Sequence, residues 1–178
     1  MRGLLAAVAV LVAGAAGAED WNDYGLVMQQ NAETVVSTLD GAGGVTLTLD
    51  MGDGVTVVCD AEGCIGQDSG GAVGCMLRIV TELRALAATC PGMADDSRRA
   101  GLEGIFDRAG AFAAANAVPP RDWAAMRAEI DGRAPPNGCP LPGSDADVMM
   151  QALSTPESIA QMDRALERPR LPVAAPCL

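Results

Sequence analysis

A serine in a run of small residues is the first feature of this sequence that could do chemistry. Ser69 stands after Asp68 in the stretch CIGQDSGGAVGC, residues 64–75. A serine hydroxyl becomes a nucleophile only when a neighbouring base, usually His or Lys, takes its proton. The chain contains no His, and all its basic residues are Arg. The composition therefore argues against a catalytic serine.

The same stretch resembles the active-site segment of trypsin-like serine proteases. The resemblance covers residues 64–75 alone, and it implies Ser69 as nucleophile with Gly66 and Gly70 shaping an oxyanion hole. The family motif is Gly-Asp-Ser-Gly-Gly, whereas here Gln67 follows Gly66. The family's histidine is missing, and two β-barrels do not fit a chain with about two expected strands. We therefore reject the protease interpretation and expect a Gly-rich loop, held by cysteines, over residues 60–75.

Carboxylates surround this stretch and give two further candidate chemistries. Oxygen ligands on Gly-rich backbone suit Ca²⁺, although no EF-hand spacing is present and a solubilising surface is the alternative. Two carboxylates could also act as acid and base in a small cell-envelope hydrolase. Aromatic residues make up only 3% of the chain, which disfavours a sugar-binding cleft. The candidate calcium ligands are Asp50, Asp53, Asp60, Glu62 and Asp68.

Six cysteines predict a disulfide framework, because an even number accompanies a predicted export signal. The spacing leaves the pairing open. A thiol redox role would require a strained or exposed Cys59–Cys64 pair. Zinc is disfavoured without histidine, no methionine pattern favours copper, and no CxxCH motif binds haem, so we expect no cofactor. The cysteines are Cys59, Cys64, Cys75, Cys90, Cys139 and Cys177.

The first residues read as a cleaved signal peptide, residues 1–18. Met1-Arg2 is followed by an apolar run over 4–12 and by the small residues Ala16-Gly17-Ala18. The run is shorter than a membrane span requires. We expect a periplasmic or secreted protein with no membrane insertion after cleavage, and the lack of Lys beside abundant Ala and Gly favours a GC-rich bacterial genome.

The charge of the chain is concentrated in its first third. The formal net charge is −11, and residues 19–77 carry ten acidic and no basic side chains. An acidic surface repels nucleic acid and anionic lipid, so neither is an expected partner. A cation or a basic protein partner would be attracted.

Hydrophobic periodicity and turn residues predict the elements. A β-hairpin is expected over 45–59, because two alternating β-rich runs flank an Asp-Gly turn. Apolar stripes at helical spacing, cap residues and prolines predict the helices and a Pro-rich linker over 133–143. The expected helices cover 22–38, 76–90, 97–115, a short segment around 123–130, 144–153 and 156–167.

These observations predict an α+β, predominantly helical fold, with one β-hairpin packed on about five helices and stapled by disulfides. One domain is expected over 19–178, with an acidic helix–hairpin–loop part (19–75) and a helical part (76–178). The expected function is that of a non-enzymatic accessory or binding protein whose acidic third contacts a basic protein or a cation. The alternatives are the carboxylate hydrolase and thiol redox chemistry.

Overall fold

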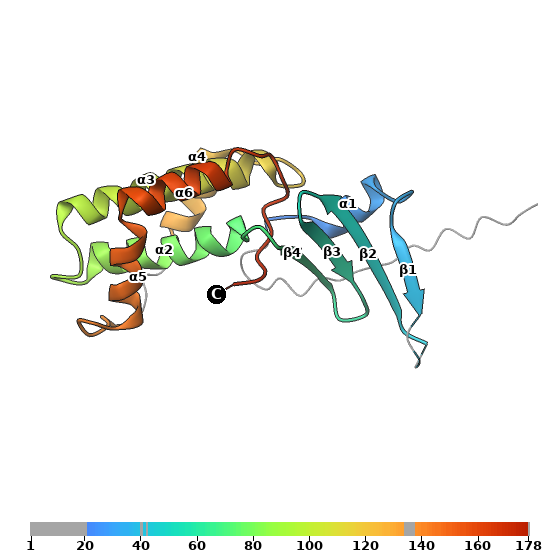
Figure 1. Cartoon of the computed structure of the whole chain (residues 1–178), viewed down its shortest axis with the longest axis horizontal. Coiled ribbons are helices and arrows are strands. Elements are labelled where there is room, and N and C mark those ends of the chain that lie inside the picture. Colours follow the sequence, from blue (N-terminus) through green and yellow to red (C-terminus); the bar gives the residue numbers. More distant parts are fainter. Residues whose placement is uncertain (1–20, 40, 42, 134–137, 178) are drawn as a thin grey trace, which may run out of the picture.

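The chain folds into an antiparallel sheet at one end and a group of helices at the other (Figure 1). The computed structural model describes residues 21–39, 41, 43–133 and 138–177. The predicted signal peptide, residues 1–18, lies outside the described residues.

The sheet contains four strands in the order β1-β2-β3-β4 among the described residues. They are β1 (Val36–Leu39), β2 (Val45–Gly52), β3 (Val55–Cys59) and β4 (Cys64–Asp68). The predicted hairpin is confirmed as β2 and β3. Its turn places Asp53 at φ 51° and Gly54 at φ 84°, and Asp and Gly are among the few residues that adopt this left-handed conformation readily.

The predictions for two segments are wrong, because each segment contains a strand. The helix expected over 22–38 ends early as α1 (Tyr24–Gln30), and the β-branched residues after it pair with β2 as β1. The loop expected over 60–75 contains β4, and α2 begins within it at Val73. In both segments long-range pairing with the hairpin prevails over local preference. The single hairpin is therefore the centre of a larger sheet.

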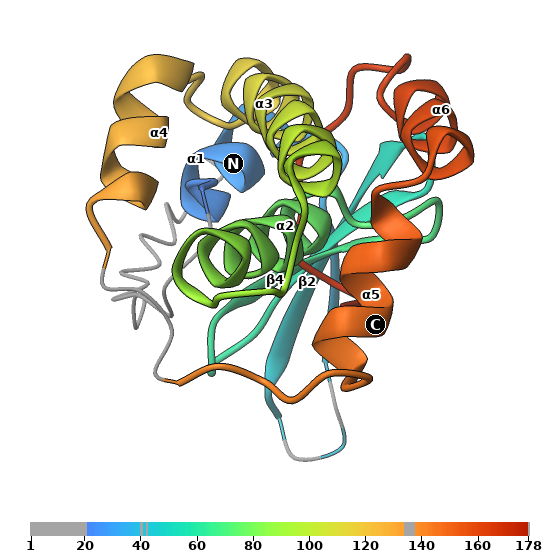
Figure 2. The ribbon, with the colours of Figure 1, turned by 90° about the vertical axis from the view of Figure 1, so that its left-hand side faces the viewer.

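The remaining helices follow the predicted positions closely. They are α2 (Val73–Thr89), α3 (Asp96–Asn116), α4 (Trp123–Asp131), α5 (Asp145–Leu153) and α6 (Pro156–Ala165). Figure 2 shows α2 and α3 side by side with the shorter helices around them. Helices make up 48% of the described residues, which confirms the α+β, predominantly helical class. Within the described residues, no helix combines the length and apolarity that crossing a bilayer requires.

One face of the sheet is buried, and a segment near the C-terminus closes it. Leu49, Val55 and Val57 pack with α1 in one apolar cluster, which also contains Leu171 and Val173. Val173 is fully buried between β4 and α2. A Cβ atom added at Gly66 would lie 2.3 Å from the Val173 side chain, and one added at Gly74 would lie 2.7 Å from the Val173 carbonyl oxygen. These two glycines therefore allow residues 171–175 to lie between the sheet and α2.

All six cysteines form disulfides, as the sequence predicted, and the structure supplies the pairing. Cys59–Cys64 links β3 to β4, and Cys75–Cys177 ties the C-terminal segment to α2 across 102 residues. Cys90–Cys139 joins the end of α2 to the segment before α5. The two cysteines that flank the protease-like stretch, Cys64 and Cys75, are therefore not partners of each other.

Candidate functional site

The protease-like stretch is a structural element of the sheet. Ser69 donates its hydroxyl hydrogen to the Gly54 carbonyl oxygen at 3.3 Å, and its N–H donates to the same oxygen at 3.0 Å. Gly66 lies against the Val173 side chain and the Tyr24 hydroxyl group, so its role is close packing. Since the chain has no histidine or lysine, nothing in this arrangement activates the serine.

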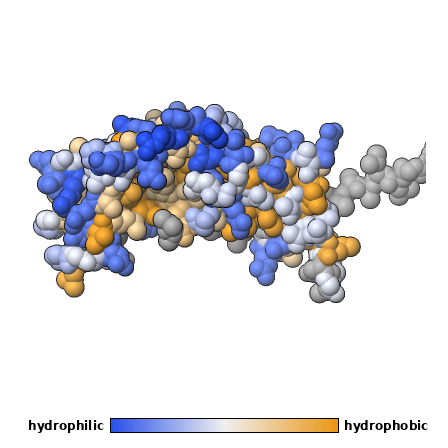
Figure 3. Space-filling view, viewed as in Figure 1, coloured by the Kyte–Doolittle hydropathy of each residue, from blue (hydrophilic) through white to orange (hydrophobic). Residues whose placement is uncertain are grey.

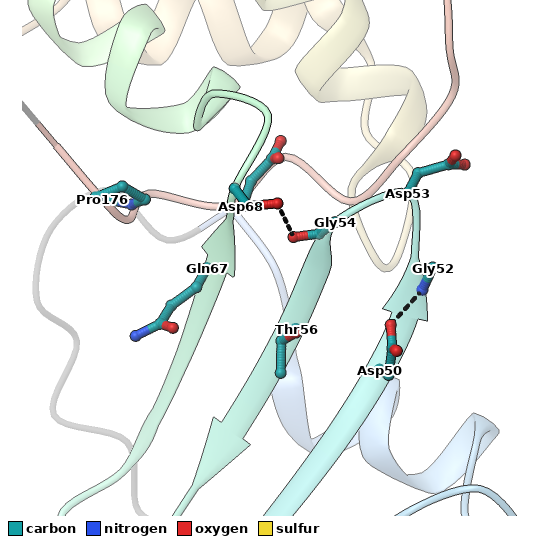
Figure 4. A pocket seen from close by; sticks show the side chains of 9 residues that line it. Asp50, Gly52, Asp53, Gly54, Thr56, Gln67, Asp68 and Pro176 are labelled. Carbon is teal, nitrogen blue, oxygen red and sulfur yellow. Dashed lines mark hydrogen bonds between the residues drawn. The ribbon is translucent and has the colours of Figure 1, made fainter.

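The five candidate calcium ligands lie at two ends of the sheet. Asp50, Asp53 and Asp68 line a pocket of about 530 Å³ at the β2–β3 turn, together with Thr56 and Gln67, here named the turn-end pocket (Figure 4). Asp60 and Glu62 lie in the β3–β4 turn, at the other end of the strands. Among the described residues, no three His, Cys, Asp or Glu side chains form a group that could hold a metal ion.

Most of these carboxylates stabilise their own turns. Asp50 accepts a hydrogen bond from Gly52 N at 2.8 Å, as Figure 4 shows. Asp60 accepts from Glu62 N at 2.8 Å and from Gly63 N at 3.2 Å. Short polar side chains commonly close turns in this way. The oxygens still face solvent, so each carboxylate also contributes negative charge to the surface.

Asp68 is an internal residue. Its side chain is 1% exposed and forms an ion pair with Arg170, whose side chain is 9% exposed, at 2.6 Å. The second carboxylate oxygen accepts from Gly70 N at 2.7 Å, and Arg170 also donates to the carbonyl oxygens of Ala165 and Gly71. The pair joins the end of β4 to the segment after α6. Asp68 is therefore committed to a structural contact within the turn-end pocket.

A second concavity opens between α1 and the buried face of the sheet, and we name it the α1 groove. Its volume is about 880 Å³, within the range of sites that hold small molecules or peptide side chains. The Cys59–Cys64 disulfide forms part of its wall. Asp23 and Asp60 line the groove together with apolar side chains, which include Leu26, Met28, Ala32, Val35, Val45 and Leu47. The groove could not be predicted from the sequence, because it depends on how α1 lies across the sheet.

Several arginines of the helical part form ion pairs with carboxylates of the same part. Arg127 pairs with Glu103, Asp107 and Asp131, and Arg84 pairs with Glu103 and Asp131. Burial lowers the pKa of Arg127, but attraction to Asp107, Glu103 and Asp131 outweighs it and raises the pKa overall. Figure 3 shows strongly hydrophilic side chains gathered over α3, α4 and α6. These arginines and carboxylates therefore compensate one another's charge within the helical part.

Among the described residues, the ion pairs of the sheet part lie at its turn end. Arg170 reaches Asp68, and Arg168 lies 3.9 Å from Asp53 with both side chains exposed. Within the residues that the structure describes, Asp23, Glu33, Asp60 and Glu62 form no ion pair. The uncompensated negative charge of the described residues thus includes the carboxylates around the α1 groove.

One carboxylate outside the sheet has a perturbed pKa. Asp147 of α5 accepts hydrogen bonds from Gly143 N at 2.9 Å and from the Gln151 side chain at 3.0 Å. These bonds favour the charged form and lower the pKa of Asp147 below its ordinary value of 3.8. The side chain stabilises the start of α5.

Comparisons of this chain with protein-family models, with curated proteins and with solved structures found no match.

Proposed function

We propose that this chain is an exported, non-enzymatic binding protein of a bacterial cell, whose acidic sheet part contacts a basic protein partner or a cation. The observation that carries the proposal is the separation of charge. Arg84 and Arg127 of the helical part pair with carboxylates of that part, while Asp23 and Asp60 line an open groove without a described cationic partner. Such a surface attracts cationic partners and repels nucleic acid and anionic lipid.

The three disulfides support a role outside the cytoplasm, where such bonds persist. They also support a structural role for the cysteines, because each pair joins elements that pack together in the fold. Cys75–Cys177 holds the C-terminal segment that completes the core, and Cys90–Cys139 fixes the chain between α2 and α5.

The runner-up is a hydrolase that uses two carboxylates of the turn-end pocket. Asp50 and Asp53 are its only candidates there among the described residues, since Asp68 is paired with Arg170. Figure 4 shows Asp50 on the strand face and Asp53 in the turn, with its carboxylate directed away from Asp50. This divergence favours the binding function over the hydrolytic one.

The test is a calorimetric titration of the purified, disulfide-bonded protein with a lysine-rich peptide and, separately, with Ca²⁺. We expect one of the two to bind, with an affinity that falls between low salt and physiological salt, because exposed charges are screened within about 8–10 Å. Salt-independent binding, or no binding of either probe, contradicts the proposal. Turnover of cell-wall glycan or peptide that disappears in Asp50→Asn would support the hydrolase instead.

A further inference from the structure

The two edge strands of the sheet, β1 and β4, differ in the main-chain neighbours that lie beside them. At the β4 edge, Asp68 N donates to the Ala175 carbonyl oxygen at 2.9 Å, and Gln67 and Ala175 form a parallel bridge. The C-terminal segment thus covers the end of β4. At the β1 edge, no strand of the described chain is a neighbour. Unpaired edges present rows of N–H and C=O groups that can pair with another chain.

The register shows which main-chain groups point outward from β1. In antiparallel sheets, residue pairs that exchange main-chain hydrogen bonds alternate with pairs that do not. Ser69 N donates to Gly54 O at the end of the β3–β4 ladder, so Gly54 and Ser69 form a hydrogen-bonded pair from which the alternation can be counted. Carried across the four strands with the observed pairings, this alternation directs the N–H and C=O groups of Ser37 and Leu39 to the open edge.

In the part of the chain that the structure describes, the short strand β1 has no charge, proline or bulge that would block pairing at its open edge. Natural edge strands are blunted by lysine, proline, charge or a bulge. The four residues of β1, Val36–Leu39, contain neither a charge nor a proline, and all four are exposed. Val36 is 59% exposed and Leu39 is 75% exposed.

The edge is continuous with the α1 groove. Leu39 lies beside Val45 in the register, and Ser37 lies beside Leu47, so these side chains share the sheet face that α1 covers. Val45 and Leu47 line the groove, as does Val35 just before β1. Figure 3 shows apolar side chains at the surface of this end of the molecule. A strand added beside β1 would therefore place alternate side chains on the groove side.

Charge decides which occupant suits this surface. Asp23 and Asp60 line the groove, Glu33 precedes β1, and no arginine is among the described lining residues. A second copy of the chain would bring like charges together across an eight-stranded sheet. A cationic segment would neutralise them.

We propose that an extended segment of a partner protein adds as a fifth strand to the open edge of β1. Its apolar side chains at alternate positions lie against the α1 groove, and basic residues at its ends meet the carboxylates there. Main-chain hydrogen bonds to Ser37 and Leu39 supply affinity, and the groove supplies selectivity. This inference rests on the proposed function and specifies the form that its basic partner takes.

The probe is the peptide KKVSVSVKK, compared with the same peptide N-methylated at alternate residues. Both peptides carry the same charge and the same side chains, but the second lacks the donors that pair with β1. We expect the first to bind with a Kd below about 1 mM and the second at least about tenfold more weakly.

Protein variants test the surface itself. Ser37→Pro removes an N–H that points outward and not toward β2, a position that edge strands tolerate, and should weaken binding about tenfold. Asp23→Asn combined with Asp60→Asn leaves an Oδ1 acceptor for the cap hydrogen bond of α1 and for the two turn hydrogen bonds of residue 60, removes two charges and should weaken binding about fivefold. Asp50→Asn is the matched control, since it removes a similar turn carboxylate from the other sheet face and should change affinity less than about twofold.

The outcomes distinguish a failure of the strand-addition inference from a failure of the proposed function. If both peptides bind equally and with the same salt dependence, the strand-addition inference is wrong while the acidic binding function stands. If Asp50→Asn weakens binding as much as the groove pair does, net charge alone attracts the peptide, and the inference is again wrong. If neither peptide binds, the strand-addition inference is overturned, and the proposed function then depends on the Ca²⁺ titration. A dimer in solution that Ser37→Pro dissociates would assign the edge to a second copy. The N-methylated peptide tests the edge even if Ser37→Pro fails to fold.

Discussion

Replacing Asp68 by Asn should destabilise the protein more than any other single change of a carboxylate in the sheet part. The new side chain would still accept from Gly70 N through its Oδ1 atom, but its amide group would present a second donor to the Arg170 Nε–H. Arg170 would then be a buried cation without its anion, since the Arg170 and Asp68 side chains are 9% and 1% exposed.

The magnitude follows from the remaining partners. Removing one member of a buried ion pair costs about 3–5 kcal/mol. Arg170 keeps the carbonyl oxygens of Ala165 and Gly71 as acceptors, so we expect about 3 kcal/mol, the lower end of that range. Arg170→Met should cost a similar amount, because it leaves the carboxylate buried. The double variant should lose less than the sum, by about 2 kcal/mol, because the two side chains interact directly.

Urea unfolding followed by far-ultraviolet circular dichroism, with the disulfides intact, measures these free energies. Asp53→Asn is the control: Asp53 pairs with Arg168 at 3.9 Å, but the side chains are 55% and 80% exposed. That pair should contribute less than about 1 kcal/mol, and Asn tolerates the positive φ at this position. Equal losses for Asp68→Asn and Asp53→Asn, or strict additivity in the double variant, would refute the reasoning.

Three further predictions concern the helical part and its links. Changing Cys75 and Cys177 to Ser together should cost about 2–5 kcal/mol in urea unfolding, because the bond closes a loop of 102 residues; an unchanged midpoint contradicts this. In α3, Gly110→Ala should destabilise, since its Cβ would lie 2.0 Å from an indole atom, whereas Gly104→Ala meets open space and should stabilise by up to about 1 kcal/mol; thermal unfolding compares the two. Because the pKa of Asp147 is lowered, its contribution is present above pH 3.8 and is lost as pH falls through the lowered pKa; amide exchange in α5 should accelerate there, and Asp147→Asn should abolish the pH step.

The parts of the fold that follow local rules could be predicted from the sequence. The hairpin is specified by its alternation and by Asp53-Gly54, whose backbone adopts the left-handed conformation that the turn requires. Ser144 caps α5 and Pro156 begins α6, as the cap and proline rules indicate. The positions of the other helices could be predicted for the same reason, since they too follow local rules.

The parts that depend on distant partners could not be predicted. Val36–Leu39 has a β-branched start but only four residues, and β2 decides its state. Gly66 suggested a loop, yet it is a strand residue kept small by Val173, far along the chain. The Asp68–Arg170 pair joins residues 102 apart and leaves no local pattern. The α1 groove also has no local sequence pattern, because it is created by the packing of α1 across the sheet.

The position of residues 171–175 sets the order in which this molecule can mature. Ribosomes deliver the chain from its N-terminus, so all four strands and α1 emerge before the segment that seals them. Without Val173, the space between β4 and α2 beside Gly66 and Gly74 is unfilled. Without Arg170, Asp68 lacks the partner of its ion pair. The core between β4 and α2 is therefore complete only when residues 171–175 are in place. A truncated chain that stops before Arg170 would lack Leu171 and Val173 in the core and the partner of Asp68, so its stability should be lower.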